Sequence, residues 1–221
     1  SMPFAQGWTL NPTKFIYPPA LRDGSTMTVK QVKKPRLNAK PGYHKDKPSL
    51  INGDYHLPRI GMMRTAQVIR KIKHSHRIIT LYFRDALCSL AEPGQFIMVF
   101  VPKFEEIPMS LSYIGTDGTS AITVTKVGET TNALFNMEVG ALIGIRGPFG
   151  KGFRISKGIR KPLLVGGGGS VGPLMPLMYR LLSSGIIPVF AMGARTFDDI
   201  KPFAREALNT LGEKRVYITT E

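Results

Sequence analysis

The residues best suited to chemistry in this chain form its densest run of glycine. The run comprises Gly167, Gly168, Gly169, Ser170, Val171 and Gly172, and it fits the spacing G-x-G-x-x-G. Glycines let a backbone turn tightly against a pyrophosphate, and a helix that follows supplies amide groups and a partial positive charge. The run predicts a nucleotide-binding turn. A turn that only lets a strand and a helix pack closely is the alternative.

An arginine follows at a distance that suits the same nucleotide. A dinucleotide site often has an acidic residue about twenty residues after the glycine turn, where it binds a ribose. This chain has Gly193, Ala194 and Arg195 in that region. Arg195 would suit a ribose 2′-phosphate or stacking on an adenine, and a solvated loop arginine is the alternative.

A second group of small and hydroxyl residues lies earlier in the chain. Such residues at strand ends can offer hydrogen bonds to a flat ring and leave room for phosphates, although turn chemistry explains each of them nearly as well. The group comprises Pro108, Met109, Ser110, Leu111 and Ser112, then Gly128, Glu129, Thr130 and Thr131, and then residues 147–153.

Side chains that could act as nucleophiles or metal ligands are few. Cys88 is the one cysteine, so the sequence excludes an internal disulfide and any metal or iron–sulfur site built from several cysteines of this chain. Its apolar neighbours predict an inert, packed thiol. The histidines, which lie in basic arm or turn segments, are interpreted as solvated: His44, His56, His74 and His76. We expect no catalytic side chain and no metal site.

Residues 62–158 have the pattern of a small antiparallel β-barrel. Six short strands with polar turns between them are expected at 65–69, 78–83, 95–101, 110–114, 121–127 and 141–146. One short helix is expected at 131–137. The second group of small and hydroxyl residues would then lie at strand ends and at the start of that helix.

Residues 159–221 alternate between strand and helix patterns. Strands are expected at 163–165, 186–192 and 216–218, with an apolar helical face between the first two at Leu174, Leu177, Met178, Leu181 and Leu182. Asp198 is expected to cap a second helix. This predicts a βαβαβ unit, a partial Rossmann-like nucleotide-binding lobe. Residues 162–179 carry no charge, but their glycines and prolines favour strand, turn and helix over a membrane span.

Residues 1–61 form a basic extension rich in proline and lysine. They hold ten Lys and Arg against three Asp, whereas the whole chain has a net charge of +15. The segment predicts either a disordered arm or an arm that lies along an acidic or nucleic-acid partner. No signal peptide is evident, and a cytoplasmic protein is the default expectation.

The order of these motifs resembles the ferredoxin–NADP reductase superfamily, most closely the electron-transfer subunit of dihydroorotate dehydrogenase. The resemblance covers about residues 64–221 and rests on 93–96, 108–111, 127–131, 147–153 and the glycine turn. It implies FAD on the barrel, with residues 108–112 along the isoalloxazine and Gly128, Thr130 and Thr131 at the pyrophosphate. Gly167 to Gly172 would face NAD(P)H. Hydride would pass to the flavin, which releases electrons singly.

The sequence departs from this family at three places. Ile107 stands where the flavin motif usually has an arginine, with Lys126 and Arg146 as candidate replacements. The lobe has three strands, and the iron–sulfur cysteines of the dihydroorotate subunit are missing. The first hypothesis is therefore an FAD-binding electron-transfer chain that works in a complex, where either a partner subunit supplies another redox centre or the chain is part of a longer subunit. The alternatives are a non-catalytic subunit that docks through its basic arm, and a flavin reductase that binds NAD(P)H only transiently.

Overall fold

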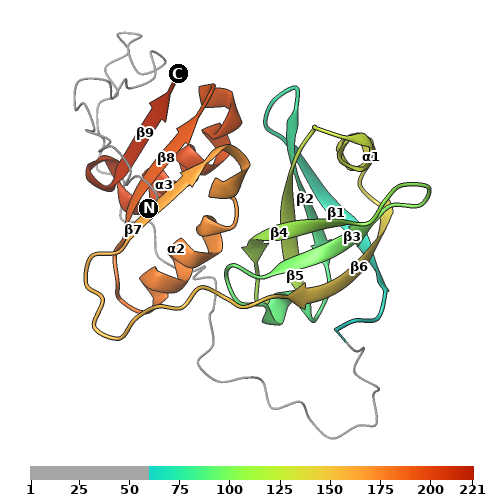
Figure 1. The fold of residues 1–221 in the computed structure, drawn as a ribbon, viewed down its shortest axis with the longest axis horizontal. Coiled ribbons are helices and arrows are strands. Elements are labelled where there is room, and N and C mark those ends of the chain that lie inside the picture. The colour runs from blue at the N-terminus through green and yellow to red at the C-terminus, as the bar shows by residue number, and fades with distance from the viewer. Residues whose placement is uncertain (1–59) are drawn as a thin grey trace, which may run out of the picture.

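The computed structural model of this chain describes residues 60–221, which form two parts. An antiparallel barrel comes first and a parallel α/β part follows it (Figure 1). The basic extension predicted for residues 1–61 lies outside the described residues, except for its last two, Ile60 and Gly61.

Six strands close the barrel in the order β1-β2-β5-β4-β3-β6, and each neighbouring pair is antiparallel. The strands are β1 Arg64–Lys73, β2 Ile78–Arg84, β3 Phe96–Phe100, β4 Ile107–Ile114, β5 Thr119–Thr125 and β6 Leu142–Phe149. The predicted barrel is therefore confirmed. Its strand ends moved by up to four residues, most of all in β1, which ends at Lys73 instead of residue 69.

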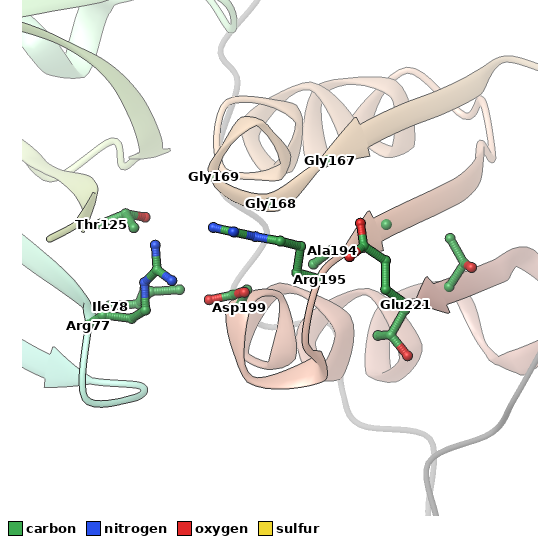
Figure 2. A pocket seen from close by; sticks show the side chains of 13 residues that line it. Arg77, Ile78, Thr125, Gly167, Gly168, Gly169, Ala194, Arg195, Asp199 and Glu221 are labelled. Atoms are coloured by element: carbon green, nitrogen blue, oxygen red, sulfur yellow. The ribbon is translucent and has the colours of Figure 1, made fainter. Parts of the chain in front are cut away.

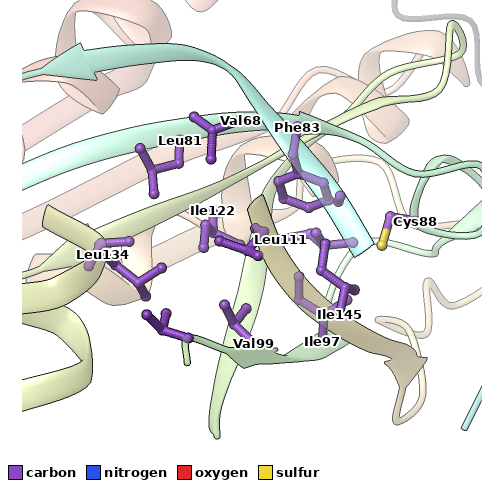
Figure 3. Close-up of a cluster of buried hydrophobic side chains, with 14 of the residues drawn as sticks. Val68, Leu81, Phe83, Cys88, Ile97, Val99, Leu111, Ile122, Leu134 and Ile145 are labelled. Carbon is purple, nitrogen blue, oxygen red and sulfur yellow. The ribbon is translucent and has the colours of Figure 1, made fainter. Parts of the chain in front are cut away.

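The barrel core is built from alternate residues of all six strands, because successive strand residues point to opposite faces. Phe83, Leu111, Ile122 and Ile145 are fully buried there (Figure 3). Helix α1, Glu129–Asn136, adds Leu134 to this core. Cys88 lies in the same core and is fully buried, as predicted for a packed thiol.

The α/β part consists of β7 Leu163–Gly167, α2 Leu174–Ser183, β8 Val189–Ala194, α3 Lys201–Leu211 and β9 Val216–Thr220. Its strands are parallel in the order β7-β8-β9, which confirms the βαβαβ prediction. One apolar core packs both helices against one face of this sheet. Leu163 and Val165 are exposed on the sheet's other side.

The uncharged stretch at 162–179 is a strand, a turn and a helix, as expected. Across residues 60–221, no helix has both the length and the apolar character needed to cross a membrane.

The start of α3 differs from the prediction. Asp198 does not cap it, because Phe197–Asp199 forms a short 3₁₀ turn and Ile200 takes the N-cap position. Proline explains the shift. A helix capped by Asp198 would place Pro202 at its fourth position, where an N–H is needed for the first helical hydrogen bond. Starting at Lys201 places Pro202 in the first turn, where no such bond forms.

Candidate functional site

The glycine run forms a tight turn between β7 and α2. Strand β7 ends at Gly167, and Gly168–Val171 make one 3₁₀ turn with Gly168 at φ +52°. Ser170 fixes the turn, because its hydroxyl accepts a hydrogen bond from the Gly167 amide at 3.0 Å and donates one to the Gly167 carbonyl at 2.8 Å. The predicted context of strand, glycine turn and helix is thus present.

The glycines of this turn serve two different purposes. A Cβ on Gly167 would have no atom nearer than the Gly193 carbonyl oxygen at 3.8 Å. A Cβ on Gly172 would lie 3.4 Å from the Ser112 Cβ of β4 and 3.5 Å from Phe203. Gly172 therefore allows close packing of the α/β part on the barrel, whereas Gly167 leaves space open in front of the strand.

That open space belongs to a cavity of about 500 Å³, a volume typical of small-molecule sites. It lies at the carboxyl ends of the parallel strands, where open α/β sheets bind ligands, and the barrel forms its opposite side (Figure 2). Its lining residues are Arg77, Ile78, Thr125, Gly167, Gly168, Gly169, Gly193, Ala194, Arg195, Asp199, Thr219, Thr220 and Glu221.

Two arginines face this cavity from opposite sides. Arg195 extends from the end of β8 into the space between the sheet and the barrel, and Arg77 approaches from the barrel (Figure 2). Within residues 60–221, neither takes part in a salt bridge. Asp199 also lines the cavity, and its carboxylate accepts a hydrogen bond from Thr196 at 3.0 Å. The structure therefore places Arg195 beside Gly167, Gly168 and Gly169. No local motif marks Arg77, Thr125 or Asp199, and these residues were not predicted.

The predicted flavin residues of β4 divide between two faces of the strand. Pro108 and Ser110 are exposed on the outside of the barrel. Met109 packs against the core and Leu111 is fully buried in it. Ser112 is the extra residue of a bulge, since Leu111 pairs with Ile122 and Tyr113 with Ala121. Only Pro108, Ser110 and Ser112 can therefore offer side chains to a ligand outside the barrel.

The second predicted flavin segment forms the start of α1, next to the start of β4. The buried Thr130 hydroxyl donates to the Glu105 carbonyl at 3.0 Å, two residues before β4 begins. The Thr131 hydroxyl accepts from the Gly128 amide at 2.8 Å and so caps the helix. Both hydroxyls are thus used within the fold, and a Cβ on Gly128 would meet no atom within 4 Å.

The two candidate replacements for the missing arginine already have partners. Arg146 pairs with Glu106, with Nε 2.8 Å from Oε1 and a second contact between Nη2 and Oε2. The Lys126 ammonium lies 5.4 Å from the centre of the Phe135 ring. Ile107 packs against the barrel core. A flavin pyrophosphate would therefore depend on backbone amides and on the open space beside Gly128.

The structure fits a nucleotide at the glycine turn and a flavin along β4. The cavity has glycine-lined space and two arginines. On the outer side of β4, Pro108 and Ser110 are exposed. Thr130 brings the start of α1 to one end of this strand, and Ser112 meets Gly172 near the other. The three predicted motifs thus lie along one strand.

The prediction that all the histidines are solvated is wrong for His74. His74 is half-buried, and its Nε2 lies 2.8 Å from the Thr80 hydroxyl. Burial lowers the pKa of its imidazole. The turn after β1 folds the ring against β2, which a run of basic residues does not reveal. In the described range, no three His, Cys, Asp or Glu residues are grouped to hold a metal ion.

Comparison with known proteins first defines the class. No protein-family model matches the chain. The cytochrome b5 reductase domain of Ulva prolifera nitrate reductase superposes with a TM-score of 0.55 at 19% identity, over 71% of this chain and 72% of that domain. The barrel followed by a parallel three-stranded α/β part is the fold of ferredoxin–NADP reductase-type flavoproteins.

The sequence relatives are more specific. A protein described as a probable dihydroorotate dehydrogenase B (NAD(+)), electron transfer subunit, from Archaeoglobus fulgidus is 42% identical over 119 residues, which is 54% of this chain and 47% of that one. A protein of the same description from Methanopyrus kandleri is 32% identical over 156 residues, which is 71% of this chain and 57% of that one. The chain therefore has a ferredoxin–NADP reductase-type fold, and its sequence is similar to archaeal proteins described as probable dihydroorotate dehydrogenase B electron transfer subunits. It spans about half the length of these curated relatives.

Proposed function

We propose that this chain is the flavin-carrying electron-transfer module of a dihydroorotate dehydrogenase B-type complex. The observation that supports this most is the placement of the glycine-lined cavity against the barrel, with Ser112 of β4 next to Gly172, where an added Cβ would lie 3.4 Å from the Ser112 Cβ. A nicotinamide nucleotide in the cavity and a flavin along β4 would then meet at this junction. A partner subunit would supply the next redox centre.

The residues of this chain would bind and orient the two groups. Gly167, Gly168 and Gly169 give a nucleotide close access to the backbone, and Arg195 and Arg77 provide positive charge for its phosphates. Pro108 and Ser110 face the flavin ring, and the start of α1 at Gly128 faces its pyrophosphate. When bound, the nicotinamide supplies a hydride and the flavin accepts it and releases electrons one at a time.

Three glycine variants test the two sites separately. Gly167→Val fills the cavity at a residue with ordinary strand geometry, and it should weaken NADH or NADPH binding at least about tenfold while FAD binding is retained. Gly128→Val should weaken FAD binding to a similar extent while NADH or NADPH binding is retained. Gly61→Val is the matched control, because a Cβ there meets no atom of residues 60–221 within 4 Å and the residue lies outside both sites.

Fluorescence titration gives both affinities, and thermal melting checks that each variant folds. If Gly167→Val and Gly128→Val bind both ligands as tightly as Gly61→Val does, the two assigned sites are wrong. If the parent chain binds neither ligand, the proposed function itself is wrong.

A further inference from the structure

A row of hydrogen-bonded side chains crosses the outside of the barrel beneath the α/β part. His74 Nε2 lies 2.8 Å from Thr80 Oγ1, Thr80 Oγ1 lies 2.9 Å from Thr123 Oγ1, and Thr123 Oγ1 donates to Ser112 Oγ at 2.9 Å. The row connects the turn after β1 to strands β2, β5 and β4. Three consecutive bonds of ordinary length make it continuous.

Donor counting gives this row a direction. Ser112 donates its hydroxyl hydrogen to the Ala121 carbonyl at 3.3 Å, so it accepts from Thr123. Each hydroxyl has a single hydrogen to donate, and therefore Thr80 donates to Thr123 and His74 donates from Nε2 to Thr80. All the hydrogens point from His74 towards Ser112, which is the arrangement that moves a proton in that direction.

The row ends where the two proposed cofactors would meet. Ser112 is the extra residue of the β4 bulge, a feature that redirects a side chain and is common beside active sites. Its Cβ is 3.4 Å from the position of a Cβ on Gly172. Ser110 lies two residues earlier, about 7 Å along an extended strand. The long, weak bond from Ser112 to Ala121 is the one that a ligand could replace.

Thr80, in the middle of the row, is shielded from water, whereas Thr123 is partly exposed. Thr80 has only 6% of its surface exposed although it lies on the outside of the barrel, and Ala121 on the same side is fully buried. Half-buried His74 is the one titratable member, at the end of the row away from Gly172. Protons would therefore enter at His74 and pass through hydroxyls.

We propose that His74, Thr80, Thr123 and Ser112 form a proton relay that serves the reduction of a flavin on β4. The inference rests on the proposed function. Reduction follows NADH + FAD + H⁺ → NAD⁺ + FADH₂, in which the nicotinamide supplies the hydride and the relay supplies the proton. Solvent protonates His74 at Nδ1, His74 gives its Nε2 proton to Thr80, each hydroxyl passes its own hydrogen onward, and Ser112 donates to the flavin, which leaves His74 neutral with its hydrogen on Nδ1.

The first test needs no cofactor. Nitrogen-15 NMR of the histidine rings should show His74 as the Nε2–H tautomer, with a His74→Gln spectrum providing the assignment. In Thr123→Val the Thr80 hydroxyl loses its acceptor and is free to donate to His74, so the ring should shift to the Nδ1–H tautomer. Thr123→Ser should restore the parent tautomer. The same His74 tautomer in the parent, Thr123→Val and Thr123→Ser would overturn the relay.

The second test uses the FAD-loaded chain with NADH in a stopped-flow spectrometer. The parent and Thr123→Ser should reduce flavin faster in H₂O than in D₂O. Thr123→Val should reduce it about 100-fold more slowly, the scale of a lost positioned proton donor. Flavin reduction at the parent rate in Thr123→Val would overturn the relay and leave the proposed function standing. A parent chain that binds FAD but is not reduced by NADH would overturn the function, and the relay's role with it.

Discussion

The buried ion pair between Arg64 and Asp85 gives a prediction that depends on no ligand. Arg64 holds the carboxylate with two nitrogens, Nε at 2.7 Å and Nη2 at 3.0 Å, and the two side chains are 10% and 7% exposed. Asp85 also accepts from the Cys88 amide at 2.8 Å, and Arg64 donates to the Gly147 carbonyl at 2.8 Å. The pair thus joins the first residue of β1 to the corner after β2 and to β6.

Asp85→Ala should cost about 3–5 kcal/mol of unfolding free energy at pH 7, because it leaves the Arg64 guanidinium buried without its partner. This is a large share of the roughly 5–15 kcal/mol that stabilises a domain. The Cys88 amide would lose its acceptor as well. Replacing both residues, as Arg64→Met with Asp85→Leu, should cost much less than the sum of the single changes, since no unpaired charge remains.

The pH dependence of this prediction has a defined sign. Burial by itself would raise the pKa of Asp85, but the hydrogen bonds from Arg64 and the Cys88 amide, with the Arg64 charge, hold that pKa below its ordinary value. A carboxyl whose pKa is lower in the folded state stabilises the fold above the unfolded pKa, about 3.9. The difference between parent and Asp85→Ala should therefore be constant from neutral pH to about pH 4 and shrink as the pH falls further.

Urea denaturation followed by circular dichroism measures these free energies, with an unchanged m value as the check that the unfolding reaction is the same. Exposed ion pairs contribute about 0–1 kcal/mol. A loss of that size in Asp85→Ala, or strict additivity in the double variant, would show that the pair is not buried in solution.

Three further experiments test the packing that positions the site. Ser120 is fully buried on β5, and its hydroxyl has no hydrogen-bond partner among the described residues, so Ser120→Ala should stabilise the chain by up to about 1 kcal/mol in urea denaturation. Burial raises the pKa of the Cys88 thiol, so an aromatic disulfide reagent should react only as fast as the chain unfolds; rapid labelling of the native chain would refute its burial. Gly166→Ala should lower the melting temperature more than Gly172→Ala, because a Cβ on Gly166 would meet Leu174 at 3.0 Å and the Val171 backbone at 3.2 Å. The opposite ranking would contradict the packing of the turn.

The strands and helices could be predicted because their signals are local. Alternating apolar residues and glycine or proline turns indicate the barrel, and the leucine spacing at 174–182 indicates α2. The position of Arg195 beside the glycine turn followed from parallel strands, whose carboxyl ends share one edge of the sheet.

The features that sequence did not predict depend on register and on distant pairs. The bulge at Ser112 adds one residue to β4 without any unusual residue type. Thr80 and Thr123 are ordinary strand formers until the pairing of β2 with β5 places their hydroxyls together. His74 looked solvated because its neighbours are basic, and its burial comes from the fold around it.

The central claim is that this chain carries a flavin that a nicotinamide nucleotide reduces. The most direct measurement is the visible absorbance spectrum of the purified chain after incubation with FAD and removal of excess, recorded before and after NADH is added without oxygen. The account predicts a bound flavin in one-to-one stoichiometry whose visible band NADH bleaches. A colourless chain, or a bound flavin that neither NADH nor NADPH bleaches, would contradict it.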